Sequence, residues 1–356
     1  KRNSNLFAFE NYISKKLKIK FNRNYKKLLN WSIKNSPVFW SRFWDFSKIK
    51  GIKSNKNFRK SKIFYKNLFL PGSRLNFGEN LLSKNNNEKA VTFISENGFR
   101  EERSWRQLNL NTNKISNFLK KINIKKGDRV AAYMPNTIQT VEAFIATTSL
   151  GGIWSSCSPD FGSKGVIERF SQINPKVLFI TDQYFYNGKK IDVLNRLPEI
   201  LKLIPSIKSV VISNYPGKKF IKIKYKFKKI NLFKWNAIMQ TNVEKIDFKR
   251  FDFETELAIL YSSGTTGKPK CICHRSGGVL IQHMKEHQLH CNIKENDNIF
   301  YFTTCGWMMW NWLVSSLASR ASIVLFDGSP MFKSADVLLK IAQREKIHLF
   351  GISAKY

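Results

Sequence analysis

The residues best suited to chemistry form one short run, YSSGTTGKPK, at positions 261–270. It directly follows the apolar run LAIL, which is typical of a buried strand. A glycine-rich turn at the end of a strand exposes backbone N–H groups that can donate to phosphate oxygens, and hydroxyls and lysines add donors and positive charge. We therefore predict a polyphosphate site. Its candidate residues are Ser262, Ser263, Gly264, Thr265, Thr266, Gly267, Lys268 and Lys270.

The spacing of this loop differs from that of the P-loop in kinases and GTPases. The P-loop has four residues between its glycines and a Ser or Thr directly after its lysine. Here two residues separate Gly264 from Gly267, and Pro269 follows Lys268. The alternative is an ordinary solvent-exposed loop of small residues, and the unbroken run of phosphate-loop residue types argues against it.

A second pattern could bind a metal ion. His283, Glu286 and His287 spell H-x-x-E-H, the pattern of one class of zinc protease, with both histidines on one helical face. Catalytic zinc needs a third ligand and an open position for water, and later acids such as Glu345 look ordinary. We expect these histidines on the helix that follows the phosphate loop and assign no metal site, so a zinc protease is a remote alternative.

The cysteines indicate a reducing compartment, and we expect a cytoplasmic protein. Five irregularly spaced cysteines do not suggest a disulfide framework. Cys271, Cys273 and His274 form C-x-C-H, which lacks the second ligand pair of a structural zinc site. The alternation of the two cysteines predicts small core residues of a strand.

The strong positive charge could indicate a polyanionic partner. The formal net charge is +36, from 61 basic and 25 acidic residues. The lysines are spread through text such as KFIKIKYKFKKI, and no zinc finger or RNA-recognition signature accompanies them. We predict a solvated basic surface and no specific nucleic-acid partner. The most apolar segment, 307–319, is too short and too polar for a membrane span.

The elements that must position these residues alternate between strands and helices from about residue 89 onward. This order predicts an α/β protein with mostly parallel sheets and flanking helices. The predicted strands are AVTFI, RVAAYM, GIWSS, KVLFIT, SVVIS, LAILYSS, IFYFTT, SIVLF and IHLFGIS. The predicted helices cover 105–121, 137–150, 165–173, 277–290 and 335–345. The basic stretch 215–250 reads as a long loop or connection.

The decapeptide at 261–270 resembles the signature phosphate loop of the adenylate-forming superfamily of acyl-CoA synthetases. The stretches LPGSRLNFGENLL, GGIWSSCSPDFG, TTCGWMMWNWLVSSLASRASIVLFDGSP and FGISAKY extend the resemblance to its acetoacetyl-CoA synthetase branch, close to acetyl-CoA synthetase. The resemblance covers about 31–356, apart from the basic stretch. It implies a truncated AMP-binding adenylation domain over 89–356, without the C-terminal domain. Residues 1–88 then form an N-terminal aromatic and basic packing segment, in which Pro37 could open a helix.

The resemblance implies a reaction in two steps. A carboxylate attacks the α-phosphate of ATP to give an acyl-adenylate and pyrophosphate, and the thiolate of coenzyme A then displaces AMP. The expected ligands are ATP, Mg²⁺, coenzyme A and a small carboxylic acid, with acetoacetate first and acetate, propionate or another small acid as alternatives. A carboxylate approaching a triphosphate needs fixed cationic donors, which the loop supplies.

The resemblance implies that the run TTCGWMMWNW at 303–312 forms one wall of the acyl pocket. By this resemblance, the residues of that wall are Trp307, Met308 and Met309. Bulky walls imply a short acid, and methionine is adaptable enough to accept one slightly longer than acetate. For Trp310 and Trp312 we favour ordinary core packing.

Other parts of the family pattern are not found before Tyr356. They are an aromatic-Gly-x-Thr-Glu segment, a ribose-binding aspartate, a hinge, and a small domain with an essential lysine. We therefore assign no catalytic residue, expect that lysine beyond residue 356, and expect this chain to be an inactive N-terminal fragment. The oligomeric state is not assigned.

Overall fold

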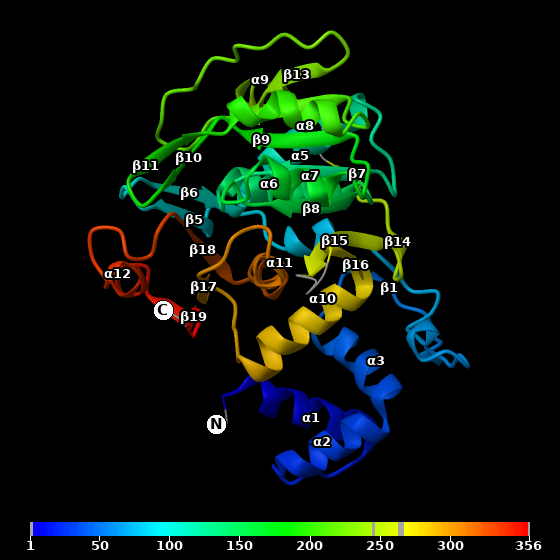
Figure 1. The fold of residues 1–356 in the computed structure, drawn as a ribbon. Coiled ribbons are helices and arrows are strands. Elements are labelled where there is room, and N and C mark those ends of the chain that lie inside the picture. Colours follow the sequence, from blue (N-terminus) through cyan, green and yellow to red (C-terminus); the bar gives the residue numbers. More distant parts are fainter. Residues whose placement is uncertain (1–2, 244–245, 263–266, 355–356) are drawn as a thin grey trace.

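The computed structural model describes residues 3–243, 246–262 and 267–354. Two large sheets with their helices form most of the molecule, and three N-terminal helices lie beneath them in the view of Figure 1. Those helices are α1 (Asn5–Leu17), α2 (Tyr25–Lys34) and α3 (Ser36–Phe46), and Pro37 stands in the first turn of α3 as predicted.

The larger sheet has seven strands in the order β13-β12-β9-β7-β8-β15-β16. All neighbours are parallel except the last pair, which is antiparallel. Four of its inner strands are buried along their whole length or nearly so, because helices cover both faces. The strands are β7 (Arg129–Tyr133), β8 (Ile153–Cys157), β9 (Val177–Thr181), β12 (Ser209–Ser213), β13 (Asn231–Lys234), β15 (Glu256–Ser262) and β16 (Lys270–Arg275).

The helices of this sheet are α5 (Trp105–Lys121), α6 (Ile138–Ser149), α7 (Ser163–Phe170), α8 (Leu197–Leu203) and α9 (Trp235–Met239). A capping box fixes the start of α5, since Ser104 and Gln107 each bond the other's backbone N–H. Every residue of α6 is buried. The reason is its place between layers, because the Phe144 ring contacts Trp154 of β8 on one side and Trp310 on the other.

The second sheet has five strands in the order β19-β17-β18-β5-β6, parallel except for β5 with β6. Its strands are β5 (Lys89–Ser95), β6 (Arg100–Ser104), β17 (Asn298–Tyr301), β18 (Ser322–Asp327) and β19 (Ile347–Gly351). The associated helices are α11 (Met308–Ser315), the short helix η4 (Ser316–Ser319) and α12 (Val337–Arg344).

Smaller elements connect the N-terminal helices to the sheets. An antiparallel sheet in the order β1-β4-β14 pairs β1 (Gly51–Ile52) and β14 (Phe251–Asp252) with β4 (Arg74–Leu75). The remaining short elements are η1 (Phe64–Lys66), the pair β2 (Phe58–Arg59) and β3 (Leu68–Phe69), α4 (Phe77–Leu81), the hairpin β10 (Gln183–Tyr186) and β11 (Lys189–Asp192), and η2 (Leu194–Arg196). Helix α10 (Ser276–Lys285) continues into the π-helical turn η3 (Glu286–His290), which packs against α1.

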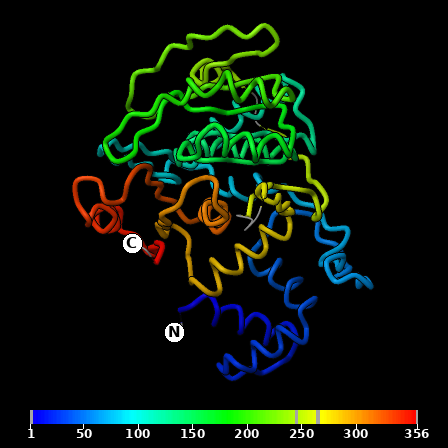
Figure 2. Tube along the Cα trace, viewed as in Figure 1, coloured from blue at the N-terminus to red at the C-terminus, as the bar shows by residue number. Residues whose placement is uncertain are grey.

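The predicted α/β class with mostly parallel sheets is confirmed, and every predicted strand and helix is present with small shifts at its ends. The basic stretch 215–250 is a long arm in part, visible along the top of Figure 2, but it also contains β13 and α9. Within the described ranges, no helix has the length and apolarity needed to cross a bilayer. The domain boundary at residue 88 stays a prediction.

Candidate functional site

The candidate site lies where the C-terminal ends of strands from both sheets meet. In open parallel sheets ligands bind at this edge. Two hydrogen bonds join the sheets here: Ser156 Oγ donates to the carbonyl of Cys305 at 2.6 Å, and Cys305 Sγ donates to the carbonyl of Met134 at 2.9 Å. The segments after β7, β8 and β17 are therefore in contact.

The predicted phosphate loop connects β15 to β16. Ser263, Gly264, Thr265 and Thr266 lie outside the described residues. Ser262 ends β15 and pairs with Lys270 at the start of β16. Gly267 has φ +87° with open space around it, so the left-handed backbone, rather than crowding, requires glycine there.

The two lysines of the loop remain available at the surface. Lys268 and Lys270 are exposed, and neither forms an ion pair with an acid in the described part of the chain. The Gln172 amide, just after α7, donates to the carbonyl of Pro269 at 2.9 Å and fixes this end of the loop. An accessible, unneutralised pair of cations suits phosphate oxygens.

A third cation near the loop was missed by the sequence reasoning. The guanidinium carbon of Arg169, on α7, lies 4.3 Å from the centre of the Phe161 ring and 5.7 Å from that of Tyr261. The Tyr261 hydroxyl is hydrogen-bonded to Ser155 Oγ at 3.0 Å, and burial raises the pKa of Tyr261. Arg169 therefore adds a fixed positive charge beside the residue that opens the loop, which only the tertiary fold brings there.

From Trp307 on, the side chains of the predicted acyl segment change from exposed to buried at the start of α11. Trp307 is the N-cap and 62% exposed, Met308 is 46% exposed, and Met309 is half-buried. Trp310 and Trp312 are buried, so the core packing favoured for them is confirmed. A methyl group added to Gly306 would lie 3.5 Å from the carbonyl of Ser156, which places this segment against the end of β8.

A family model for AMP-binding enzymes matches residues 80–353. The chain belongs to the AMP-binding enzyme family.

Several AMP-binding relatives resemble the whole chain. It is 40% identical to acetoacetyl-coenzyme A synthetase of Rhizobium meliloti over 94% of this chain and 51% of that protein. It is 39% identical to acetoacetyl-CoA synthetase of Gallus gallus, over 100% and 54% respectively. The solved structure of acetoacetyl-CoA synthetase from Streptomyces lividans superposes with a TM-score of 0.92 at 31% identity, covering 100% of this chain and 54% of that one. The chain thus spans about half the length of these relatives.

The histidine pattern of this AMP-binding chain is part of its core. His283 Nδ1 is hydrogen-bonded to Ser315 Oγ at 2.9 Å, and His287 Nε2 to the carbonyl of Trp312 at 3.1 Å. Burial lowers the pKa of both histidines, to about 4 for His283. Glu286 accepts from the indole N–H of Trp312 at 2.8 Å. In the described residues no group of three or more His, Cys, Asp or Glu could hold a metal ion, so the structure gives the zinc protease no support.

The expectation that Cys271 and Cys273 are core residues is wrong. They do lie on a strand, β16, but both are exposed. The reason is that β16 is the edge strand of its sheet. Cys157 and Cys305 are buried near the candidate site, and burial raises the pKa of Cys157 to about 12 and that of Cys305 as well, which leaves both thiols protonated.

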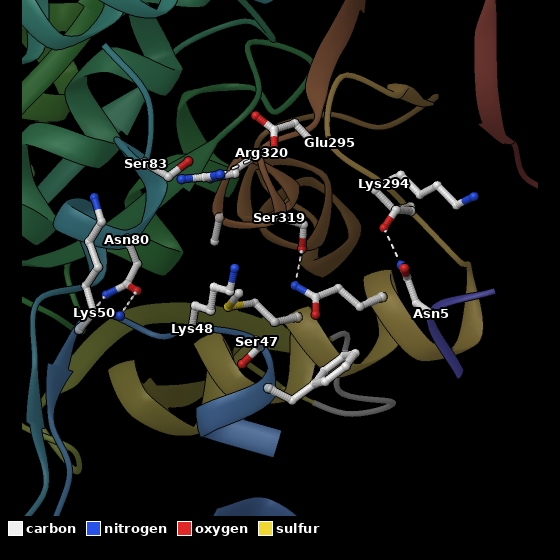
Figure 3. Close-up of a pocket in the computed structure, with 15 residues that line it drawn as sticks. Asn5, Ser47, Lys48, Lys50, Asn80, Ser83, Lys294, Glu295, Ser319 and Arg320 are labelled. Carbon is white, nitrogen blue, oxygen red and sulfur yellow. Dashed lines mark hydrogen bonds and ion pairs between the residues drawn. The ribbon is translucent and has the colours of Figure 1, made fainter. Parts of the chain in front are cut away.

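A cavity of about 340 Å³ lies elsewhere, near the N-terminal ends of β17 and β18 (Figure 3). Its polar side chains are mostly satisfied within the protein: Asn80 bonds the backbone of Lys50 through both amide atoms, and Ser83 Oγ donates to the carbonyl of Leu317. Arg320 pairs with Glu295 at 3.3 Å. We do not assign the nucleotide to this cavity, because it shares no residue with the phosphate loop.

Proposed function

We propose that a protein carrying this chain is an acetoacetate–CoA ligase. It would convert acetoacetate, ATP and coenzyme A to acetoacetyl-CoA, AMP and pyrophosphate through an acyl-adenylate. The observation that carries the proposal is the 39–40% identity to acetoacetyl-CoA synthetases of a bacterium and a vertebrate over nearly the whole chain. The reaction is proposed for the whole protein and not for residues 1–356 alone.

In this proposal the loop at 262–270 binds the triphosphate. Its described residues supply a hydroxyl and two lysines and no carboxylate, which fits phosphate oxygens better than direct ligation of a metal. Mg²⁺ would therefore be held mainly by the phosphates and would neutralise part of their charge. Residues 1–88 would pack against an adenylation domain that begins at residue 89, in a cytoplasmic enzyme.

Trp307, Met308 and Met309 would line the acyl pocket. They directly follow Gly306, which lies against the end of β8, and β8 pairs with β15, the strand that leads into the loop. This arrangement would bring the carboxylate of the acid towards the α-phosphate, and such positioning can lower a barrier by roughly 7–11 kcal/mol.

A second candidate substrate has support from one relative. The chain is 34% identical to malonamoyl-CoA synthetase of Penicillium aethiopicum over 100% of this chain and 52% of that protein. Malonamate and acetoacetate have the same shape and differ in an amide nitrogen against a methyl group. A polar group facing that end of the pocket would favour malonamate, whereas an apolar wall such as Met308 favours acetoacetate.

The test is acid-dependent exchange of labelled pyrophosphate into ATP by the complete protein. Acetoacetate, malonamate, acetate and propionate are compared at equal concentrations. We expect the highest kcat/KM with acetoacetate. Exchange that is fastest with another short acid would reassign the substrate, and no exchange with any acid would refute the ligase.

A further inference from the structure

We propose that Asn136 is a positioning residue that sets the acyl pocket by holding both ends of the segment 303–310. The inference rests on the proposed function, because it concerns the pocket wall assigned to Trp307, Met308 and Met309. Asn136 follows β7 of the large sheet, whereas the segment it holds follows β17 of the smaller one.

Asn136 uses its side chain on three partners. The amide nitrogen donates to the carbonyl of Thr303 and to that of Phe326, each at 3.2 Å, and the amide oxygen accepts from the indole N–H of Trp310 at 2.9 Å. The side chain is 1% exposed, so water does not replace a lost partner. Both donors and the acceptor are thereby engaged, which fixes the orientation of the amide.

Two of these partners flank the proposed pocket wall. Thr303 precedes Trp307 by four residues, and Trp310 follows Met309 directly in α11. A single buried amide therefore fixes where the segment leaves the sheet and how the first turn of α11 is rotated. Trp310 is held on its other side by the ring of Phe144, with centroids 5.4 Å apart.

A fourth contact, made by the backbone, holds Asn136 itself in place. Its backbone N–H donates to Asp327 Oδ1 at 3.0 Å, and Asp327 Oδ2 accepts from the hydroxyl of Tyr215 at 3.0 Å. Asp327 ends β18, so the amide is clamped from the same sheet that carries the acyl segment. A shift of this amide would move Met308 and Met309 without touching the phosphate loop.

A purely structural role would predict a different result. A buried asparagine that only stabilises the fold would lower stability when replaced and leave the preference among acids unchanged. A residue that positions the pocket wall would raise KM for the acid and change the preference, while KM for ATP stays the same.

The decisive variant is Trp310→Phe, in the complete protein. It removes the indole N–H together with part of the buried ring and keeps a phenyl ring against Phe144, whereas Asn136→Ala strands three partners and carries a greater risk of misfolding. We expect KM for acetoacetate to rise about 3- to 10-fold, KM for ATP to stay within twofold, and the preference for acetoacetate over propionate to fall.

The matched control is Asn80→Ala. Asn80 is also buried, and its amide also bonds backbone groups on two segments, at Lys50 and Asn76, but it lies away from the acyl segment. We expect lower stability and unchanged KM for the acid. If Trp310→Phe and Asn80→Ala lose stability alike and both keep the acid preference, the inference is overturned. If the unaltered protein shows no acid-dependent exchange, the proposed function fails instead.

Discussion

The predicted phosphate loop and the helical stretch α10–η3, which carries His283 and His287, both contain residues typical of catalysis, yet the fold exposes the lysines of the first and buries the histidines of the second. Lys268 and Lys270 stand at the surface without a described acidic partner. His283 and His287 are buried, hydrogen-bonded and low in pKa. Polar groups left accessible at the carboxyl edge of a sheet can meet a ligand, whereas the buried histidines each bond within the core through one ring nitrogen, and Nδ1 of His287 has no partner in the described part of the chain.

The same contrast occurs within a single helix. At the start of α11, Trp307 and Met308 are exposed, while Trp310 and Trp312 further along are buried. Residue type alone does not distinguish the exposed positions, which we propose as a pocket wall, from the core, since each group contains a tryptophan. The difference lies in which side chains face packed neighbours.

The largest expected effect is the response of the buried histidines to acid. Their folded pKa values lie below the usual 6.5, so the unfolded chain binds more protons between about pH 4 and 6.5. Their contribution to stability is present above pH 6.5 and is lost as the pH falls. With a folded pKa of about 4, His283 alone accounts for roughly 3 kcal/mol.

The measurement is the free energy of unfolding against pH for the unaltered chain and for His283→Gln. Asp327 and Glu142, whose pKa values burial raises to about 7, lower the stability as the pH rises, and their contributions cancel between the two proteins. We expect the unaltered chain to lose more stability between pH 6.5 and 4. If the free energy of unfolding had the same pH dependence in both proteins, His283 would not be a buried neutral group.

His287→Ala comes next. The substitution removes the contact with the Trp312 ring, at 4.3 Å between centroids, and a buried hydrogen bond. We expect the free energy of unfolding to fall by about 2–3 kcal/mol. His290→Ala is the matched control, because His290 is exposed on the same turn and should change little. If the unaltered chain bound one equivalent of zinc and His287→Ala did not, the histidines would form a metal site rather than part of the core.

Lys268→Ala should act on binding rather than on folding. Loss of one charge-assisted hydrogen bond to phosphate costs about 1.5–3 kcal/mol, which corresponds to roughly 10- to 100-fold weaker binding of ATP with Mg²⁺. Calorimetric titration measures this, with Lys26→Ala on the exposed surface of α2 as control. Unchanged affinity would remove Lys268 from the proposed site.

The smallest expected effect is the difference between alanine substitutions at two glycines, Gly267 and Gly278. Gly267 has φ +87°, so Gly267→Ala should cost about 1–2 kcal/mol of local strain and weaken ATP binding to a similar extent. Gly278 lies in α10 with open space around it, and Gly278→Ala should stabilise the helix by up to about 1 kcal/mol. Chemical denaturation and ATP titration of both variants check the difference in sign.

Local signals predicted most of the secondary structure. The predicted helix 105–121 coincides with α5, and the structure shows that Ser104 caps its start. Strand β6 was missed because REERS has no apolar alternation, and its charges find partners far along the chain, as in the contact of Arg100 with Glu345 at 2.9 Å. Local sequence spacing cannot predict an ion pair between residues so far apart in the chain.

The candidate site could be predicted only in part, for the same reason. The loop at 261–270 is recognisable because its chemistry lies in consecutive residues. Arg169 reaches the site because α7 packs near β15 of the large sheet, and Asn136 reaches it because the two sheets pack together. Cys271 and Cys273 show the converse error, because alternation predicts a strand but does not tell which strand lies at the edge.

The antiparallel pairing of β15 with β16 also has a consequence for how the length of the predicted phosphate loop can vary. Ser262 and Lys270 face each other across the ladder, so the two ends of the loop are held about 5 Å apart. Added residues between such fixed ends cost little, about 0.6 kcal/mol for each doubling in length. Insertions in this loop should therefore be tolerated by the fold, and selection against them would report on the ligand alone.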